Sequence, residues 1–120
     1  MGLDQYINYE NDDGIGEEIY LRKVNWLRNW VIANTELTHE DDCKPVYIPR
    51  YKIESLLKDC KTVLEHKEKA PELLPTVSGF FFGSTEYDED YYSDVEYVSL
   101  KLEEILSNKT VEEVTYNDWW

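Results

Sequence analysis

Apolar residues recur at helical spacing in three segments of the chain. Side chains three and four residues apart share one face of a helix, so each segment predicts an amphipathic helix with one buried stripe. The first helix is expected over residues 17–34, with the stripe Tyr20, Val24, Leu27 and Val31. The second is expected over residues 50–66, with the stripe Ile53, Leu56, Leu57, Cys60 and Leu64. The third is expected over residues 87–106, with the stripe Tyr91, Val95, Val98, Leu102 and Ile105.

Three short runs rich in β-branched and aromatic residues alternate with these helices. They cover residues 3–9, 45–48 and 77–82, and each predicts a strand. Residues 10–16 are typical of a loop, and residues 114–120 are left as a tail. The order strand, helix, strand, helix, strand, helix predicts an α+β fold. We expect a single small domain over residues 1–120, with three main helices packed on a short sheet and one shared core.

The third β-type run has the most distinctive sequence. Its three consecutive phenylalanines, Phe80, Phe81 and Phe82, lie between Gly79 and Gly83. Side chains alternate across a strand, so we expect Phe81 to be buried and its two neighbours to face the opposite side. Gly79 marks a bulge or a close backbone approach, and one of the two glycines is expected to adopt a backbone conformation that other residues disfavour.

The charge of the chain limits its partners. It has 26 acidic and 12 basic residues, which give a net charge of −14. Such an excess disfavours direct binding to nucleic acid, which requires a basic surface, and adhesion to anionic membranes. It favours a basic partner protein or a cation. The chain also lacks an apolar run long enough to span a membrane and a signal peptide, so we expect a cytoplasmic protein with reduced thiols.

Acidic residues are densest where the third predicted helix begins. Thr85 or Asp88 is a candidate N-cap, and acids in the first turn suit the positive end of the helix. Acids further along the helix have two readings, a solvated face or a negative surface that binds something basic. The candidate partner-binding residues are Glu86, Asp88, Glu89, Asp90, Asp94 and Glu96.

One concentrated basic and polar patch lies on the first predicted helix. It consists of Arg22, Lys23, Asn25 and Arg28. These residues could be solvated and paired with the acidic surface. The functional alternative is a pocket for a nucleotide-like anion, closed by the segment 79–86. The residues of that alternative ligand site are Arg22, Lys23, Asn25, Thr85 and Glu86.

The chain shows no pattern for catalysis or for metal binding. Counted from Asp88, a calcium loop would need glycine and glutamate at the positions of Ser93 and Ser99. His39 and His66 are too few and too far apart for a zinc site, and neither cysteine has a histidine nearby to activate it. We therefore expect no enzyme activity, no cofactor and no metal.

Several blocks of the chain resemble a family of small, mostly uncharacterised proteins of tailed bacteriophages. The most specific block contains the motif LLPT-x-SGFFFGSTEYDE, within residues 73–92. Arg22, Lys23 and Asn25 match polar positions of that family, whereas Arg28 replaces a histidine and Asp90 replaces a tryptophan. The resemblance implies a phage origin and an intracellular role during infection of the host cell, and it implies no particular activity.

Two functions follow as hypotheses. The first is a phage accessory protein that inhibits a basic host protein, such as a nuclease, another nucleic-acid enzyme or a CRISPR-type defence protein. Its acidic surface would act as a DNA mimic, with carboxylates in place of phosphates. The second is a protein that binds or sequesters a small anion. Mimicry requires the acids of residues 86–104 in one exposed sheet of charge, whereas ligand binding requires a concave pocket beside Arg22.

Overall fold

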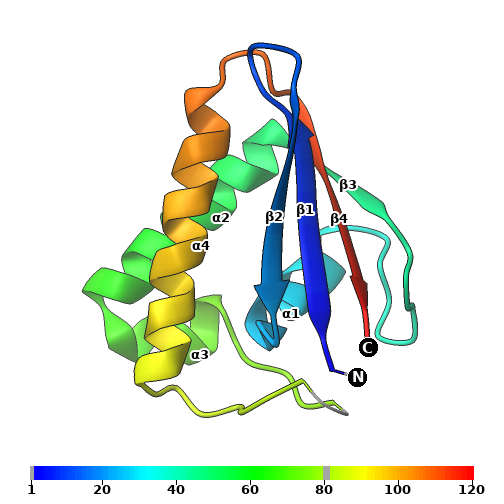
Figure 1. The fold of residues 1–120 in the computed structure, drawn as a ribbon. Helices are drawn as coiled ribbons and strands as arrows, with labels where there is room; N and C mark the ends of the chain where they lie inside the picture. The colour runs from blue at the N-terminus through cyan, green and yellow to red at the C-terminus, as the bar shows by residue number, and fades with distance from the viewer. Residues whose placement is uncertain (1, 80–81) are drawn as a thin grey trace.

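A computed structural model describes residues 2–79 and 82–120 of the chain (Figure 1). The chain begins with a hairpin, continues through helices and one short strand, and ends in a strand. In order, the elements are β1 (Asp4–Glu10), β2 (Gly16–Arg22), α1 (Asn25–Asn34), β3 (Val46–Pro49), α2 (Arg50–Glu65), a 3₁₀ turn (Lys67–Lys69), α3 (Ala70–Leu73), α4 (Glu89–Ser107) and β4 (Glu113–Trp119).

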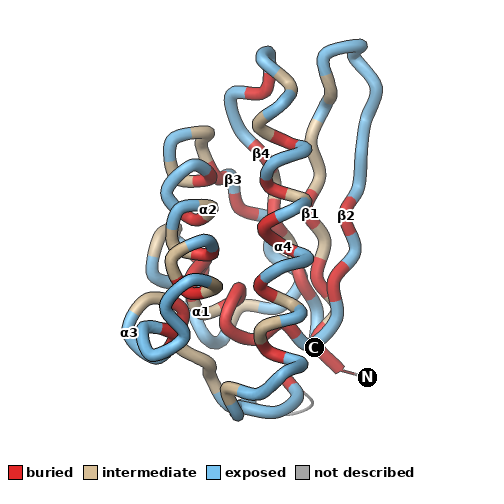
Figure 2. Tube along the Cα trace, turned by 90° about the vertical axis from the view of Figure 1, so that its left-hand side faces the viewer, coloured by how far each residue is buried: buried red, intermediate tan, exposed pale blue. Residues whose placement is uncertain are grey.

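The four strands form one antiparallel sheet in the order β2-β1-β4-β3. The first and last strands of the chain therefore pair at its centre, where Ile7 lies opposite Tyr116. The helices gather on one face of this sheet, and the other face carries no helix in the described part of the chain (Figures 1 and 2). The α+β fold with helices on a short sheet is confirmed.

The core lies between the sheet and the helices, where buried positions of both layers meet (Figure 2). Strand residues alternate, so that Ile19 and Leu21 of β2 face the helices while Tyr20 between them is exposed. The residues expected to share the core do so: Leu27, Leu56, Tyr91, Val95 and Leu102. None of the helices in the described part is both long and apolar enough to cross a membrane.

The second and third predicted helices are confirmed as α2 and α4, but the first prediction is wrong over residues 17–22. That segment is β2: its buried and exposed residues alternate, and it pairs with β1 along its whole length. Asn11 starts the turn between the two strands: its Oδ1 accepts hydrogen bonds from the N–H groups of Asp13 and Ile15, at 2.9 and 3.0 Å. Gly14 has φ of 77°, a conformation that glycine adopts at little cost.

The strands predicted at residues 3–9 and 45–48 are confirmed as β1 and β3, whereas the strand predicted at residues 77–82 is wrong for its described residues. Residues 77–79 and 82 belong to a loop instead, and β4 completes the sheet from the segment that had been left as a tail. Phe82 is buried, and a Cβ on Gly79 would lie 2.6 Å from its ring, which confirms the close approach. Gly83 has φ of 88°, as expected for one of the two glycines. The predictions for Phe80 and Phe81 lie outside the described residues.

A buried ion pair ties α1 to β4. Arg28 is 1% exposed, and its Nη1 donates to both carboxylate oxygens of Asp118 at 2.6 Å. Its Nη2 donates to three backbone oxygens of the loop before β3, those of Thr38, His39 and Asp41. The surface position expected for Arg28 is therefore wrong, because the guanidinium finds all of its partners inside the fold.

The network continues across the sheet. The Tyr116 hydroxyl donates to Asp118 Oδ2 at 2.5 Å and accepts from Gln5 Nε2 at 3.0 Å. The same Gln5 amide bonds both backbone groups of Val24, at 2.8 and 2.9 Å. Burial, together with the charge of Asp118, raises the pKa of Tyr116 well above its usual value. The phenol therefore stays protonated and serves as a hydrogen-bond donor.

Truncating Leu102 should be costly. We expect Leu102→Ala to lower the free energy of unfolding by about 2–5 kcal/mol, because its side chain is fully buried in α4. Leu100→Ala is a matched control, since Leu100 is 53% exposed on the same helix and its truncation should change stability by less than about 0.5 kcal/mol. Urea unfolding of both variants measures this, and equal losses would contradict the assigned core face.

Removing one partner of the buried ion pair should also be severe. We expect Arg28→Met to cost about 3–5 kcal/mol, since Asp118 would remain buried with its charge uncompensated. The double variant Arg28→Met/Asp118→Leu should recover part of that loss, because it removes the stranded charge. A double variant as unstable as the sum of both single variants would show that the carboxylate is not the source of the cost.

Candidate functional site

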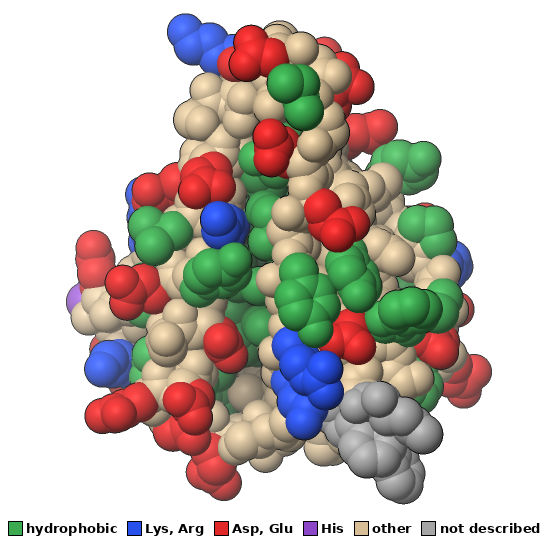
Figure 3. Space-filling model, viewed as in Figure 1, with side chains coloured by type: hydrophobic (Ala, Val, Ile, Leu, Met, Phe, Trp, Pro, Cys, Tyr) green, Lys and Arg blue, Asp and Glu red, His purple; other side chains and the backbone are tan. Residues whose placement is uncertain are grey.

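A hollow of about 200 Å³ lies where the end of β2, the start of α1 and the start of α4 meet. We call it the α4 pocket. Its described lining residues are Arg22, Lys23, Asn25, Trp26, Thr76, Gly83, Ser84, Glu86, Asp88, Asp90, Tyr91 and Asp94. On the face drawn in Figure 3, basic side chains gather at the lower end of β2, and acidic side chains surround them on several elements.

The pocket unites the two sites that the sequence suggested separately. From the acidic set it contains Glu86, Asp88, Asp90 and Asp94, and from the ligand set it contains Arg22, Lys23 and Asn25. Three predicted residues are not among its lining: Glu89, Glu96 and Thr85. Four of the predicted acids therefore border a concave site beside Arg22.

Asn25 builds the pocket wall. Its Nδ2 donates to the backbone oxygens of Phe82 and Ser84, at 3.1 and 3.0 Å, and its Oδ1 accepts from the N–H of Val77 at 3.2 Å. Both amide hydrogens are thus committed to the loop between α3 and α4. The side chain expected to contact a ligand is the one that holds this loop against α1.

The loop closes on Lys23. Lys23 has φ of 58°, a left-handed conformation, and its N–H donates to the backbone oxygen of Leu3 at 2.7 Å. A Cβ on Gly83 would lie 3.2 Å from the Lys23 Cβ, so glycine allows the loop to come this close. Arg22, the residue before Lys23, forms an ion pair with Asp4, and its Nη1 lies 3.3 Å from Asp4 Oδ1. The basic edge of the pocket is therefore fixed by backbone contacts and by an ion pair.

The acidic edge is set by the start of α4. Asp88 is the N-cap, and its Oδ1 accepts from the N–H of Tyr91 at 3.1 Å, which confirms one of the two predicted caps. Glu89 and Asp90 follow in the first turn, where the helix dipole stabilises negative charge. Tyr91 turns inward and donates to the backbone oxygen of Leu74 at 2.7 Å. Asp94 lies one turn further along, beyond the reach of this stabilisation.

Asp94 is the most perturbed carboxyl of the pocket. Burial, followed by the charges of Asp90 and Asp88, raises its pKa to about 6. Ionisation of Asp94 is thus less favourable than that of an ordinary aspartate, because the carboxylate is partly shielded from water and faces like charges. A cation placed between these carboxylates would stabilise the ionised form and lower the pKa.

Trp26 adds a hydrogen-bond donor to the site. It lines the pocket and packs edge-on against Tyr91, with ring centroids 6.1 Å apart. Its indole Nε1 is buried and has no hydrogen-bond partner among the described residues. A buried donor without an acceptor costs about 1–3 kcal/mol. Trp26 is not among the candidate residues drawn from the sequence; its place next to Asn25 in the chain is the signal that could have pointed to it.

The described residues contain no group of three or more His, Cys, Asp or Glu side chains arranged to hold a metal ion. The pocket carboxylates are close enough to influence one another but do not converge as metal ligands. The thiols also lack activation: burial raises the pKa of Cys60 to about 12, and desolvation and Asp42 raise that of Cys43. The chemistry that the α4 pocket offers is recognition by charge and hydrogen bonds.

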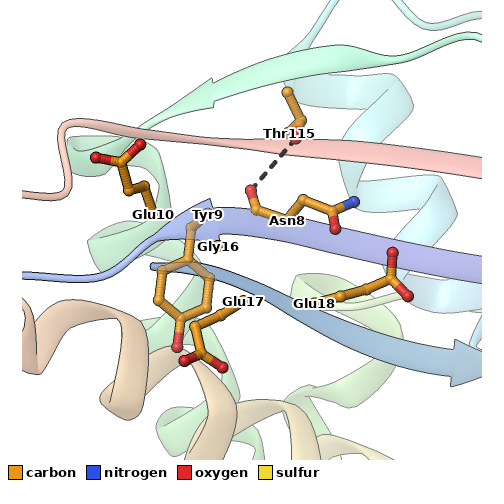
Figure 4. Close-up of a pocket in the computed structure, with 7 residues that line it drawn as sticks. All are labelled: Asn8, Tyr9, Glu10, Gly16, Glu17, Glu18 and Thr115. Atoms are coloured by element: carbon orange, nitrogen blue, oxygen red, sulfur yellow. Dashed lines mark hydrogen bonds between the residues drawn. The ribbon is translucent and has the colours of Figure 1, made fainter. Parts of the chain in front are cut away.

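A second hollow, of about 340 Å³, lies over the β1–β2 hairpin (Figure 4). Tyr9 and Glu17 extend to one side of the strands, while Glu18 points away along β2. One hydrogen bond joins two lining residues of this hollow: Thr115 Oγ1 donates to the backbone oxygen of Asn8 at 3.3 Å. Its side chains do not meet at one point, so this hollow is a weaker candidate than the α4 pocket.

Comparison of the chain with protein-family models, with curated proteins and with solved structures found no match.

Removing the charge of Asp94 should stabilise the protein near neutral pH. The folded-state pKa of about 6 lies above the ordinary value of 3.8, so the folded protein binds this proton more tightly than the unfolded chain does. Stability from this group therefore falls as pH rises from about 4 to about 6. We expect Asp94→Asn to raise the melting temperature at about pH 7.5, and the gain to vanish near pH 4.

The control is Glu96→Gln, which removes the same charge from an exposed position two residues along α4. If both variants raise the melting temperature equally at neutral pH, the effect comes from net charge and not from the pocket.

Proposed function

We propose that this protein is an interaction protein that captures a guanidinium or ammonium group of a basic partner in the α4 pocket. The observation that carries the proposal is the perturbed carboxyl group of Asp94 beside Asp88 and Asp90. These charges disfavour one another in the free protein and favour a cation between them. An organic cation suits the site better than a metal ion, because the described acids do not converge as ligands.

The pocket also offers hydrogen-bond donors for the backbone carbonyl that lies near the side chain of an arginine or lysine residue. Lys23 and Trp26 both line the pocket, and both side chains carry hydrogen-bond donors. The indole Nε1 of Trp26 is buried and has no partner among the described residues. An arginine or lysine residue of a protein carries a backbone carbonyl near its cationic side chain, so it offers an acceptor as well as a positive charge. The net charge of −14 favours a partner whose surface is basic around that residue.

The resemblance to tailed-bacteriophage proteins supports a more specific role. A phage protein with this pocket would act in the cytoplasm of the host cell, on a basic host protein such as a nuclease or a CRISPR-type defence protein. Recognition would then rest on insertion of a basic side chain into a pocket, with the remaining acids accelerating association as a general negative field. This differs from mimicry of a DNA backbone by a flat acidic face.

A second candidate is a small free ligand that is both cationic and anionic. The ammonium group of a free amino acid would pair with the carboxylates, and its carboxylate would lie near Arg22 and Lys23. A purely anionic ligand such as a nucleotide fits less well, because four carboxylates border the pocket against two basic residues.

Titration with Nα-acetyl-argininamide, a minimal arginine side chain with a backbone carbonyl, tests the proposal. We expect nuclear magnetic resonance shifts at Asp94 and at the Trp26 indole, and affinity that falls as pH drops through about 6, because protonation of Asp94 removes its charge. The double variant Asp90→Asn/Asp94→Asn should weaken binding by about tenfold or more.

The matched control is Glu89→Gln/Glu96→Gln, which removes the same charge from α4 outside the pocket and should leave binding nearly unchanged. Adenosine monophosphate serves as the anionic probe. Binding of that nucleotide, retained in Asp90→Asn/Asp94→Asn and lost in Lys23→Gln, would replace the proposal with anion binding. Binding of free arginine but not of Nα-acetyl-argininamide would favour the small-ligand candidate.

A further inference from the structure

The helix-free face of the sheet carries a row of three aromatic side chains. Tyr20 of β2 lies directly opposite Tyr6 of β1, and their ring centroids are 5.4 Å apart. Trp119 of β4 lies diagonally across from Tyr6, at 6.4 Å and nearly perpendicular to it. Figure 3 shows hydrophobic side chains gathered over the lower parts of these strands.

These rings are packed against one another and remain open to solvent. Tyr20 is 47% exposed and Trp119 is 52% exposed. An antiparallel sheet with one face in water normally places polar side chains there, and contiguous exposed apolar surface marks an interaction site. Tyrosine and tryptophan are also the residues that most often dominate binding energy at interfaces.

A hollow beside the aromatic row adds uncharged and acidic polar groups to this face. It measures about 470 Å³ and is lined by Tyr6, Asn8, Glu18, Cys43, Asn117 and Trp119. Two amides and one carboxylate therefore surround the aromatic surface. The amides both donate and accept hydrogen bonds, the carboxylate accepts them, and the described lining holds no basic side chain.

Charge selects among the possible occupants of this face. Asp4 accepts from the Tyr20 hydroxyl at 2.5 Å, and Asp42 accepts from the backbone N–H of Trp120 at 3.0 Å beside the row. Arg22 stands at the end of β2 but is paired with Asp4. Phosphates of a nucleic acid would meet carboxylates, and a second copy of this chain would bring like charges together.

We propose that this aromatic row docks an arginine-bearing surface of the partner protein, as a second contact separate from the α4 pocket. A guanidinium stacks on Tyr and Trp rings and forms paired hydrogen bonds with a carboxylate such as Glu18, which a lysine ammonium does less well. The inference rests on the proposed function for the basic character of the partner, and it adds a surface and a preference for arginine.

Titration of the isotope-labelled full chain with oligo-arginine and with oligo-lysine of equal length tests the inference. We expect oligo-arginine to bind more tightly and to shift the backbone signals of Tyr6 and Tyr20 and the indole signal of Trp119. Trp119→Ala should weaken oligo-arginine binding by about threefold or more, since it removes a cation–π contact without changing the net charge. Glu18→Gln should weaken it as well.

Tyr51→Ala is the matched control, because Tyr51 is an exposed aromatic residue on α2, on the helical side of the sheet. Equal binding of the two peptides, unaffected by Trp119→Ala, would overturn the inference in favour of diffuse attraction. A dimer that Trp119→Ala dissociates would also overturn it, by assigning the face to a second copy.

The two proposals fail separately. If oligo-arginine shifts only signals of the α4 pocket and Asp90→Asn/Asp94→Asn alone weakens it, the aromatic row is not a docking surface and the pocket proposal stands. If only the sheet face responds and Trp119→Ala alone weakens binding, the inference stands and the pocket proposal falls.

Discussion

The buried pair between Arg28 and Asp118 is the interaction on which the rest of this structure depends. It joins α1 to the last strand, and β4 in turn pairs with both β1 and β3. The guanidinium also holds the loop before β3 through three backbone oxygens. Desolvating two charges is costly, so such a pair adds little net stability over an apolar pair. Its contribution here is to define one arrangement, because any other would leave a buried charge without a partner.

The pocket depends on that arrangement through α1. Arg28 fixes the helix against the sheet, and Asn25, one turn earlier, holds the loop that leads to α4. Phe82 in that loop and Trp120, the residue after β4, both approach the Arg28 guanidinium, with ring centroids 5.7 and 5.5 Å away. The residues that build the α4 pocket are therefore mostly structural, and those left to contact a ligand are Lys23, Trp26 and the carboxylates.

The sequence predicted what depends on local periodicity and missed what depends on long-range pairing. The stripes of α2 and α4 were correct because each helix follows its own 3.6-residue pattern. Residues 17–22 were misassigned because Tyr20 also matches the helical series that continues through Val24 and Leu27, while alternation around Ile19 and Leu21 and the preceding Asp-Gly turn favoured a hairpin. The inward positions of β4 are Val114, Tyr116 and Asp118. Because Asp118 is charged, the sequence of this segment does not show the alternation of apolar and polar residues that predicts a strand.

The candidate site was predictable in its residues but not in its shape. Seven of the predicted residues line the pocket, whereas Thr85, Glu89 and Glu96 do not. Nothing in local spacing indicates that the end of β2 and the start of α4 meet, because that contact follows from the sheet order and from the hydrogen bonds of Asn25 to the loop before α4. Arg28 shows the same limit. In the sequence it extends a basic patch, and only the distant Asp118, 90 residues later, explains why it is buried.

Two acids of this chain, Asp12 and Asp94, show opposite effects of ionisation on the stability of the fold. Asp12 accepts hydrogen bonds from Lys109 and Thr110, which lower its pKa, so its ionisation stabilises the fold. Asp94 is the reverse case, since its ionisation opposes folding. Local choices that disagree with the stability of the fold concentrate at functional sites. A cation bound beside Asp94, as proposed, would relieve the repulsion among these carboxylates, whereas the net charge of −14 acts over the whole surface and selects no position.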